Sequence, residues 1–232
     1  MRNSQTKDNI EVPNHTETEV TMSEPVKKKL KVLVACEESQ TVCMAFRELG
    51  HEAYSCDILH CSGGHPEWHI QGDAIKEAYS GKYDMMIAHP PCTYLSYVGN
   101  RHWNNPGRAE KRAEALEFFM ALVNAPISKI CVENPLGEPS RAYRKYDQII
   151  HPYYFGDPFM KRTCLWLKNL PSLTWDKDAA VKPEPLFYLK TNGKAINWVE
   201  GIKGMSAAER QKARSVTYQG IADEMAKQWG NL

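Results

Sequence analysis

The stretch LKVLVACEESQTVCMAFRELG, residues 30–50, decides the fold class of the chain. Its first part, LKVLVAC, is a short apolar run rich in β-branched residues, as in a strand that is buried on both faces of a parallel sheet. The part that follows places Val42, Phe46 and Leu49 on one helical face and stops at Gly50, a residue common at helix ends. The stretch therefore predicts a strand, a turn and a helix.

The alternation of strands and helices continues beyond residue 50. HEAYSCDI (51–58), YDMMIAH (83–89) and SKICVEN (128–134) have the composition of buried strands, and GRAEKRAEALEFFMALVNAP (107–126) has that of an amphipathic helix. Strands that alternate with helices indicate an α/β fold, a doubly wound Rossmann-like sheet with parallel strands and helices on both faces. The inner face expected of the long helix consists of Ala113, Leu116, Met120 and Val123.

Further elements are expected in the last third of the chain. TCLWLKNLPSL (163–173) is typical of an apolar strand, and LFYLKTNGKAINWV (186–199) of two short strands around an Asn-Gly turn. Ser206 and Glu209 have the spacing of a helix capping box. A last helix is expected from about Ile221 to Trp229.

The length of 232 residues suits one domain whose core needs no disulfides. Residues 1–29 are polar and nearly free of aromatic side chains, so we expect a disordered tail before a single domain over residues 30–232. Within it, residues 169–215 are expected to form a hairpin insert or a reduced recognition segment. The formal net charge is +1, but from residue 160 onward twelve Lys and Arg stand against seven Asp and Glu. This excess suits a phosphate-facing surface and equally an ordinary solvated face.

The seven cysteines are an odd number, and several lie inside apolar stretches, which is typical of reduced thiols in the cytoplasm. They lack the paired CxxC spacing of zinc sites, so no metal is expected. No apolar run reaches the roughly 20 residues that span a bilayer, and the N-terminus lacks the apolar core of a signal peptide. We therefore expect a soluble cytoplasmic protein without membrane contact. The sequence leaves its oligomeric state open.

The segment AHPPCTYLS, residues 88–96, places Cys92 directly behind two prolines at the end of an expected strand. A cysteine there is commonly a packing residue. The prolines remove backbone donors and stiffen the loop, which holds the thiol at the carboxyl edge of the sheet, where such folds bind ligands. Cys92 is therefore a candidate nucleophile. A free thiol has a pKa of about 8.5, so its activation requires nearby positive charge or helix N-terminal amides.

The segment VENP, residues 132–135, places Glu133 and Asn134 at the end of another expected strand. A glutamate there is often only solvated. Cysteine attack on C6 of a pyrimidine, however, pushes negative charge into the ring, and a protonated carboxyl at N3 neutralises that charge. Cys92 and Glu133 are a matched pair for this reaction.

These segments, in this order, resemble those of the cytosine-C5 DNA methyltransferases, most closely a short version common in bacteriophages and prophages. The resemblance covers roughly residues 30–230. It is carried by AHPPCTYLS and VENP, by the acidic strand end at Asp57 and the GD of QGDA, and by FGDPFMKRTCLWLKNLP and TYQGIADEMAKQWG. The resemblance implies a Rossmann-like fold, S-adenosyl-L-methionine as cofactor and methylation of DNA in the cytoplasm of a host cell.

The resemblance also implies roles for individual residues. Cys92 attacks C6 of cytosine, Glu133 holds N3 and the exocyclic amine, and the activated C5 takes the methyl group. Asn134 braces the Cys92 loop. In a duplex the base must first be flipped out of the stack. The candidate cofactor-binding residues are Cys36, Glu37, Glu38, Ser39, Asp57, Ile58, Asp73, Ala74, Pro90 and Gln219.

The chain departs from the family pattern at three places. The glycine-rich cofactor loop is replaced by ACEESQ, residues 35–40, and without glycine a positive φ is costly. The Gln-x-Arg-x-Arg pattern before the late strand is reduced to FMKRT, which leaves Lys161 and Arg162 as candidate catalytic cations. The sequence-reading domain shrinks to residues 169–215.

Several alternatives stay open. The same motifs serve RNA cytosine or a free nucleotide, and the glycine-free loop also fits a catalytically silent relative that binds nucleic acid or a host protein. The amino-methylating DNA methyltransferases have an acid or amide before Pro-Pro, where this chain has His89. The loop GNRHWNNPGR (99–108) can stack on bases through Trp103. His60, His65 and His69 favour a loop bordering the cofactor site over a metal site.

Overall fold

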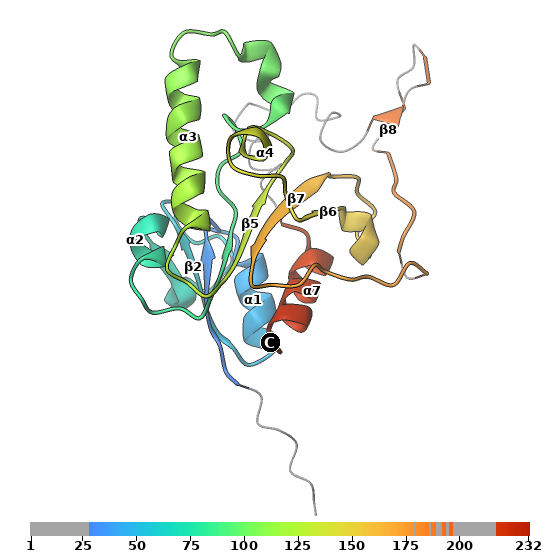
Figure 1. Cartoon of the computed structure of the whole chain (residues 1–232). Coiled ribbons are helices and arrows are strands. Elements are labelled where there is room, and N and C mark those ends of the chain that lie inside the picture. Colours follow the sequence, from blue (N-terminus) through green and yellow to red (C-terminus); the bar gives the residue numbers. More distant parts are fainter. Residues whose placement is uncertain (1–27, 179, 186, 189–191, 194, 197–216) are drawn as a thin grey trace, which may run out of the picture.

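The computed structural model describes residues 28–178, 180–185, 187–188, 192–193, 195–196 and 217–232. A seven-stranded sheet lies at its centre, with strand order β3-β2-β1-β4-β5-β7-β6 (Figure 1). The strands are β1 (Lys31–Ala35), β2 (Glu52–Asp57), β3 (His69–Gln71), β4 (Met85–Ala88), β5 (Lys129–Asn134), β6 (Gln148–Ile150) and β7 (Thr163–Lys168). The tail expected over residues 1–29 and the capping pair Ser206 and Glu209 lie outside the described residues, except for residues 28 and 29.

Helices cover both faces of the sheet, which confirms the expected doubly wound α/β fold. The α-helices are α1 (Thr41–Glu48), α2 (Ala74–Ala78), α3 (Arg108–Val123), α4 (Pro139–Ala142) and α7 (Gln219–Trp229), and the 3₁₀ helices are η1 (Pro66–Trp68), η2 (Tyr97–His102) and η3 (Pro152–Phe155). Helices α1 and α7 lie side by side on one face, and α2 and α3 meet on the other (Figure 1).

The residues of β1 explain why the strand is apolar throughout. Val32 and Val34 pack into the cluster that contains α1 and α7, while Leu33 and Ala35 pack into the cluster that contains α2 and α3. All of these side chains are fully buried. Successive residues of a strand point to opposite faces, so a strand covered on both sides loses the polar alternation of an exposed sheet.

The sheet is mixed at one edge, where an all-parallel sheet was predicted. β1, β2, β3, β4 and β5 run parallel, but β7 is antiparallel to both β5 and β6. Residues 151–162 between β6 and β7 hold only the one-turn η3, so the chain reverses direction instead of crossing over through a long helix. β7 then inserts between β5 and β6.

The long helix α3 turns Leu116, Met120 and Val123 toward the core as predicted, but the centre of its inner face is displaced. Its fully or nearly fully buried residues are Phe119, Leu122 and Val123, and Ala113 is exposed. The ring of Phe119 packs edge-on against Trp166 of β7, with ring centroids 5.1 Å apart and an interplanar angle of 81°. Aromatic rings contribute more buried area than a methionine or an alanine. The large ring therefore sets the rotation of the helix, shifting the inner face by about one residue.

The short hairpin predicted around Asn192 and Gly193 is present. β8 (Phe187–Tyr188) pairs antiparallel with β9 (Ala195–Ile196), and Gly193 adopts a φ of 65°. This is the left-handed conformation that glycine adopts without the strain of a side chain. No helix in the described part of the chain combines the length and apolarity needed to cross a membrane.

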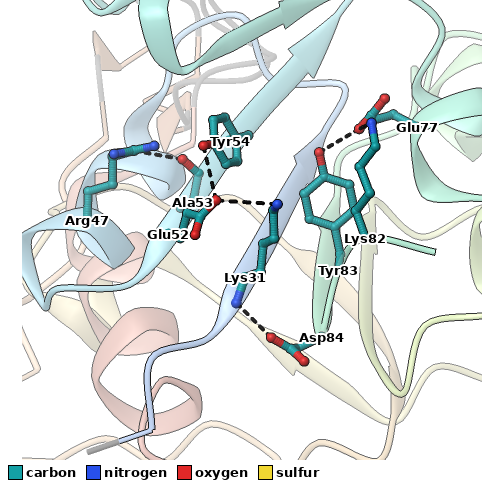
Figure 2. Close-up of polar contacts among 9 residues, drawn as sticks. All are labelled: Lys31, Arg47, Glu52, Ala53, Tyr54, Glu77, Lys82, Tyr83 and Asp84. Atoms are coloured by element: carbon teal, nitrogen blue, oxygen red, sulfur yellow. Dashed lines mark hydrogen bonds and ion pairs between the residues drawn. The ribbon is translucent and has the colours of Figure 1, made fainter. Parts of the chain in front are cut away.

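Polar side chains at the amino end of the sheet contact one another, as Figure 2 shows. The backbone N–H of Lys31 donates to Asp84 at 2.8 Å, and its ammonium lies 3.4 Å from Glu52. The hydroxyl of Tyr83 donates to Glu77 at 2.7 Å. These groups connect the starts of β1, β2 and β4. Folds of this class bind ligands at the opposite end, where the carboxyl ends of the strands form the carboxyl edge of the sheet.

Candidate active site

The loop that carries Cys92 follows β4 directly. Pro90 is buried, Pro91 is exposed, and Cys92 is half-buried. The carbonyl oxygen of Cys92 accepts hydrogen bonds from the N–H groups of Leu95, at 3.1 Å, and Ser96, at 2.9 Å. This tight turn holds the thiol at the carboxyl edge of the sheet, outside the packed core.

The Cys92 loop is fixed to the segment that follows the neighbouring strand β5. The buried amide of Asn134 donates to the carbonyl oxygen of Pro90 at 2.9 Å. Further along, Ser96 forms an antiparallel bridge with Gly137, and the N–H of Glu138 donates to the carbonyl oxygen of Leu95 at 2.8 Å. Cys92 is thus held on both sides by the strand end that carries Glu133.

Gly137 is the residue that lets the two segments approach so closely. A Cβ atom at this position would lie 2.0 Å from the carbonyl oxygen of Leu95, far inside van der Waals contact. The bridge between the Cys92 loop and the segment after β5 therefore requires glycine there.

Glu133 lies beside His89, the residue that separates β4 from the prolines. Nδ1 of His89 lies 3.3 Å from Oε2 of Glu133, and the two side chains are 9% and 17% exposed. Burial alone would raise the pKa of Glu133, but the hydrogen bond from His89 and the positive charges of Lys161 and His89 outweigh it. The pKa of this carboxyl is therefore held below its ordinary value.

The lowered pKa describes Glu133 in the free protein, where the group is a carboxylate at neutral pH. The expected role, a protonated carboxyl at N3 of a bound base, stays a prediction. Sequence reasoning missed the cause of the lowered pKa, since the role of His89 becomes apparent only when β4 and β5 lie side by side.

Five of the seven cysteines have surroundings that do not suit a nucleophile. Burial raises the pKa of Cys43, Cys56 and Cys164 to about 12 and that of Cys131 well above its ordinary value. Burial, reinforced by nearby acidic groups, also raises the pKa of Cys36. Cys61 is half-buried, and its thiol donates to the side chain of Gln40 at 3.0 Å. Thiols with raised pKa values are inert, so Cys61 and Cys92 are left, and of these two Cys92 lies on the loop after β4.

The two candidate cations before β7 have different surroundings. The positive charge of Lys161 acts on Glu133 and lowers the pKa of that carboxyl, and its ammonium also lies 5.7 Å from the centre of the Tyr218 ring. The charge of Arg162 instead acts on His151, whose pKa burial and Arg162 together lower. Of these two cations, Lys161 is therefore the one whose charge acts on Glu133.

The glycine-free loop after β1 adopts two left-handed conformations despite its composition. Cys36 has a φ of 61° and Gln40 a φ of 63°. Each costs about 1 kcal/mol for a residue with a side chain. The N–H of Cys36 is held by the carbonyl oxygen of Cys56 at 2.7 Å. The absence of glycine thus does not prevent the sharp turn, and the surrounding contacts offset its strain.

The carboxyl group of Glu37, a residue of the loop before α1, lies at the N-terminus of that helix. Its carboxylate accepts hydrogen bonds from the N–H groups of Val42, at 2.7 Å, and Cys43, at 3.2 Å. The residue is 4% exposed, and burial raises the pKa of its carboxyl despite the opposing charge of His89 and these two hydrogen bonds. A helix N-terminus binds phosphate when its amides are free. Here two of these amides are not free, because they donate hydrogen bonds to Glu37.

The rest of this loop is held by residues 61–65. The side chain of Glu38 accepts a hydrogen bond from Ser62, and the fully buried amide of Gln40 bonds both the carbonyl oxygen and the N–H of His65, at 2.8 and 3.0 Å. A Cβ atom at Gly63 would lie 2.4 Å from the carbonyl oxygen of Ser39. Sequence reasoning missed Gln40 and Gly63, because nothing in the chain indicated that these two loops pack together.

Two acidic residues of the expected cofactor site lie near the turn after β1. Asp57 ends β2 and accepts a hydrogen bond from the N–H of Leu59 at 2.9 Å, and Asp73 caps α2 through the N–H of Ile75 at 2.8 Å. Their charges both contribute to the raised pKa of Cys36, which places the three side chains near one another.

The remaining cofactor candidates are more scattered. Ile58 is 76% exposed beside Asp57, whereas Ala74 is buried in the core. The hydroxyl of Ser39 lies 3.3 Å from that of Thr41. Gln219, at the start of α7, donates to Asp223 on its own helix at 2.7 Å. The structure thus brings together Cys36, Asp57 and Asp73, but it directs Gln219 toward its own helix.

Two of the histidines after β2, His65 and His69, make structural contacts. The ring of His65 stacks on Trp68 with centroids 4.1 Å apart, and His69 contacts the hydroxyl of Ser55 and the carbonyl oxygen of Leu59. Among the described residues, no three His, Cys, Asp or Glu side chains gather in a way that could hold a metal ion.

Comparisons with known proteins give weak similarities. No protein-family model matches the chain, and no curated protein matches its sequence. Among solved structures, the Dnmt2 methyltransferase of S. pombe is 19% identical, with 65% of this chain and 54% of that chain covered and a TM-score of 0.44. The methyltransferase EhMeth of Entamoeba histolytica is 16% identical, with 68% of this chain and 57% of that chain covered and a TM-score of 0.42. Dnmt2 of Spodoptera frugiperda is 15% identical, with 76% of this chain and 60% of that chain covered and a TM-score of 0.38.

In each of these pairs the matched part spans less than two thirds of the other chain. At identities below 20% and TM-scores below 0.5, these similarities identify neither a reaction nor a substrate. The function must be argued from the side chains at the carboxyl edge of the sheet.

Proposed function

We propose that the protein transfers a methyl group from S-adenosyl-L-methionine to C5 of cytosine in DNA, with Cys92 as the nucleophile. The observation that supports this most is the attachment of the Cys92 loop to the strand end of Glu133, through Asn134 at Pro90 and the bridge at Gly137. A nucleophile and a carboxyl group fixed to adjacent strand ends are what attack on C6 of a pyrimidine requires.

The proposed reaction uses the residues of this edge as follows. The Cys92 thiolate forms a bond to C6 of the base, and the electron pair of the C5–C6 double bond gains nucleophilic character at C5. The negative charge that develops at N3 is neutralised by a proton delivered through Glu133, and the charge of Lys161 stabilises the carboxylate that remains. After methyl transfer C5 loses its proton to water, and the bond from Cys92 to C6 breaks to restore the double bond and release the thiolate.

The acidic groups around the turn after β1 fit the proposed cofactor. S-adenosyl-L-methionine, when bound, supplies a methyl group made electrophilic by the positive charge on its sulfur. Because Glu37 occupies the amides at the start of α1, that end is closed to the phosphates of a dinucleotide. Asp57 and Asp73 add carboxylates that suit hydroxyl groups and a cationic ligand, and the exposed side chain of Ile58 offers apolar surface for a ring.

DNA is the proposed substrate class because a cytosine base is reached by flipping, and the loop after Cys92 carries groups that bind bases and phosphates. Within that loop and the following helix, the guanidinium of Arg112 lies 3.6 Å from the centre of the Trp103 ring, and that of Arg108 lies 5.0 Å from the Tyr94 ring. RNA cytosine and free nucleotides share the same reactive ring and remain alternative substrates for the test.

The test is mass spectrometry of nucleosides from DNA and RNA of cells that express the protein. We expect 5-methyldeoxycytidine to rise in DNA with the native chain, to return to background with Cys92→Ser, and to persist with Cys61→Ser. The control alters another half-buried cysteine whose hydrogen bond to Gln40 a serine can still make. A rise in RNA alone would move the proposal to that substrate.

A second assay with purified protein isolates the covalent step. DNA that contains 5-fluorocytosine blocks the release of the C5 substituent, so the bond between Cys92 and C6 persists and the complex survives denaturation. The proposal requires such a complex with the native chain and S-adenosyl-L-methionine, and its loss with Cys92→Ser. No modified nucleoside in either pool and no trapped complex would favour a silent binding relative.

A further inference from the structure

His89 lies at the carboxyl ends of three neighbouring strands, β1, β4 and β5. Its backbone N–H donates to the carbonyl oxygen of Ala35 at the end of β1, at 2.9 Å. Its ring nitrogen Nδ1 lies 3.3 Å from Glu133 of β5, and the side chain is 9% exposed. The imidazole is therefore largely buried at the carboxyl ends of these strands, and His89 directly precedes the two prolines.

His89 interacts with two buried acids at once. Its charge acts on Glu133 from one side and on Glu37, in the loop after β1, from the other. Glu37 belongs to the turn proposed to bind the cofactor, and Glu133 to the site proposed to bind the base. The titratable groups around the imidazole are thus Glu37 from the loop after β1, Glu133 from β5 and Lys161 through its charge on Glu133, with Cys92 further along its own loop.

The second ring nitrogen, Nε2, is buried and has no hydrogen-bond partner among the described residues. The same holds for Oδ1 of Asn134, whose amide nitrogen braces the proline loop. Native proteins rarely leave buried polar atoms unpaired, and each such atom needs an explanation, for example a catalytic role or a bound water or ion. Both unpaired atoms belong to residues in direct contact with the Cys92 loop or with Glu133.

Cysteine attack on a cytosine needs a proton that Glu133 does not carry. The carboxylate is ionised in the free protein, yet the electron pair that moves toward N3 must be neutralised there. A proton donor in contact with Glu133 can supply what the carboxylate lacks, and His89 is a titratable side chain at hydrogen-bonding distance from it.

We infer that His89 is a positioning residue that orients Glu133 and shares with it the proton delivered to N3 of the base. As the bond from Cys92 to C6 forms, the proton passes from the imidazolium to Glu133 and from Glu133 to N3, and the imidazole becomes neutral. When the thiolate leaves C6, N3 returns the proton by the same path. No proton is gained or lost by the pair over the cycle. This inference rests on the proposed function.

The experiment compares His89→Asn with His89→Leu. An asparagine amide can donate to Glu133 from about the position of Nδ1 but carries no exchangeable charge, whereas leucine removes the hydrogen bond as well. His65→Asn is the control, because the His65 ring stacks on Trp68 and contacts Glu67 at the surface. His89→Gln is the second conservative variant should either replacement prevent folding.

The first measurement is the carboxyl titration of Glu133 by carbon NMR, with Glu133→Gln to assign its signal. We expect the pKa of Glu133 to rise in His89→Leu and to stay unchanged in His65→Asn. This readout needs no methyl transfer. An unchanged pKa in His89→Leu would overturn the inference whatever the protein catalyses.

The second measurement is the pH profile of adduct formation with 5-fluorocytosine DNA. We expect His89→Asn to bind DNA like the native chain but to form the adduct roughly 10- to 100-fold more slowly, with a changed dependence on pH. Adduct formation at the native rate in His89→Asn would refute the proton-sharing role while the methyltransferase proposal stands. No adduct with the native chain, together with the expected titration of Glu133, would refute the proposed function and with it the delivery to N3.

Discussion

At the scale of single residues, two buried carboxyl groups on either side of one imidazole have opposite pKa shifts. Burial disfavours the charge of both Glu37 and Glu133. For Glu37 burial prevails over two backbone hydrogen bonds and the charge of His89, whereas for Glu133 the hydrogen bond from His89 and the charges of Lys161 and His89 prevail. The balance is thus decided by which cations lie close to each group.

The shift of Glu37 leads to a prediction about stability and pH. A carboxyl whose pKa is higher in the folded chain ionises first in the unfolded chain, so its contribution to the free energy of unfolding falls as pH rises from near its ordinary 4.5 through the folded value. We expect Glu37→Gln to abolish this fall. Glu37→Ala should also remove the cap of α1, at a cost of about 1 kcal/mol at low pH.

Urea unfolding of the native chain and both variants at a series of pH values measures these differences. A native chain whose stability, relative to Glu37→Gln, rises with pH would contradict the prediction.

At the scale of elements, the site depends on two segments that follow neighbouring strands and pair with each other. Neither AHPPCTYLS nor VENP alone predicts that Ser96 meets Gly137, since the contact forms only after β4 and β5 have paired. The strand ends themselves could be predicted, because each is a short apolar run followed by polar residues or proline. What the sequence could not provide was the partner of each loop.

Gly137→Ala tests this pairing. The added methyl group would overlap the carbonyl oxygen of Leu95, so we expect the free energy of unfolding to fall by about 1–3 kcal/mol and adduct formation by Cys92 to slow. Gly72→Ala is the matched control, since nothing lies within 4 Å of a Cβ atom there. It should change the stability by less than about 0.5 kcal/mol. Equal effects of the two substitutions in urea unfolding would argue against a required close approach.

The helix α3 illustrates a second limit of sequence reasoning. Its period was readable, but its rotation was predicted about one residue away from the observed one: Leu116 and Met120 are only partly buried against the core, whereas Phe119 is fully buried. The deciding contact is with Trp166, which lies on a strand that enters the sheet out of sequence order. Periodicity reports the type of an element, and the packing partner decides its orientation.

At the scale of the whole molecule, the fold class followed from the alternation of apolar strands and helices, while the strand order did not. The insertion of β7 between β5 and β6 depends on long-range pairing that short motifs do not encode. The candidate site shows the same division. Cys92, Glu133 and Asn134 were identifiable from their motifs, whereas His89 and Gln40 acquire their roles only from neighbours distant in sequence.

Trp229 tests how far one face of the sheet depends on α7. Its ring is fully buried against that face, and its indole N–H donates to the carbonyl oxygen of Pro171 at 3.0 Å. We expect Trp229→Ala to lower the free energy of unfolding by about 3–5 kcal/mol. Lys227→Ala, which removes an exposed ion pair with Glu224, should change it by less than about 1 kcal/mol. Thermal or urea unfolding measures both, and similar losses would show that the helix is not an anchor.

The position of α7 beside α1 has a consequence for how the protein is made. A ribosome synthesises β1, α1 and β4 long before it reaches residues 219–229, so the apolar face formed by Val34, Phe46 and Met85 waits without its cover while translation continues. During that interval the nascent chain offers a binding surface for chaperones that recognise apolar segments. A premature stop codon before α7 would therefore leave a polypeptide with an exposed apolar face, prone to aggregation or proteolysis, and not a smaller folded protein.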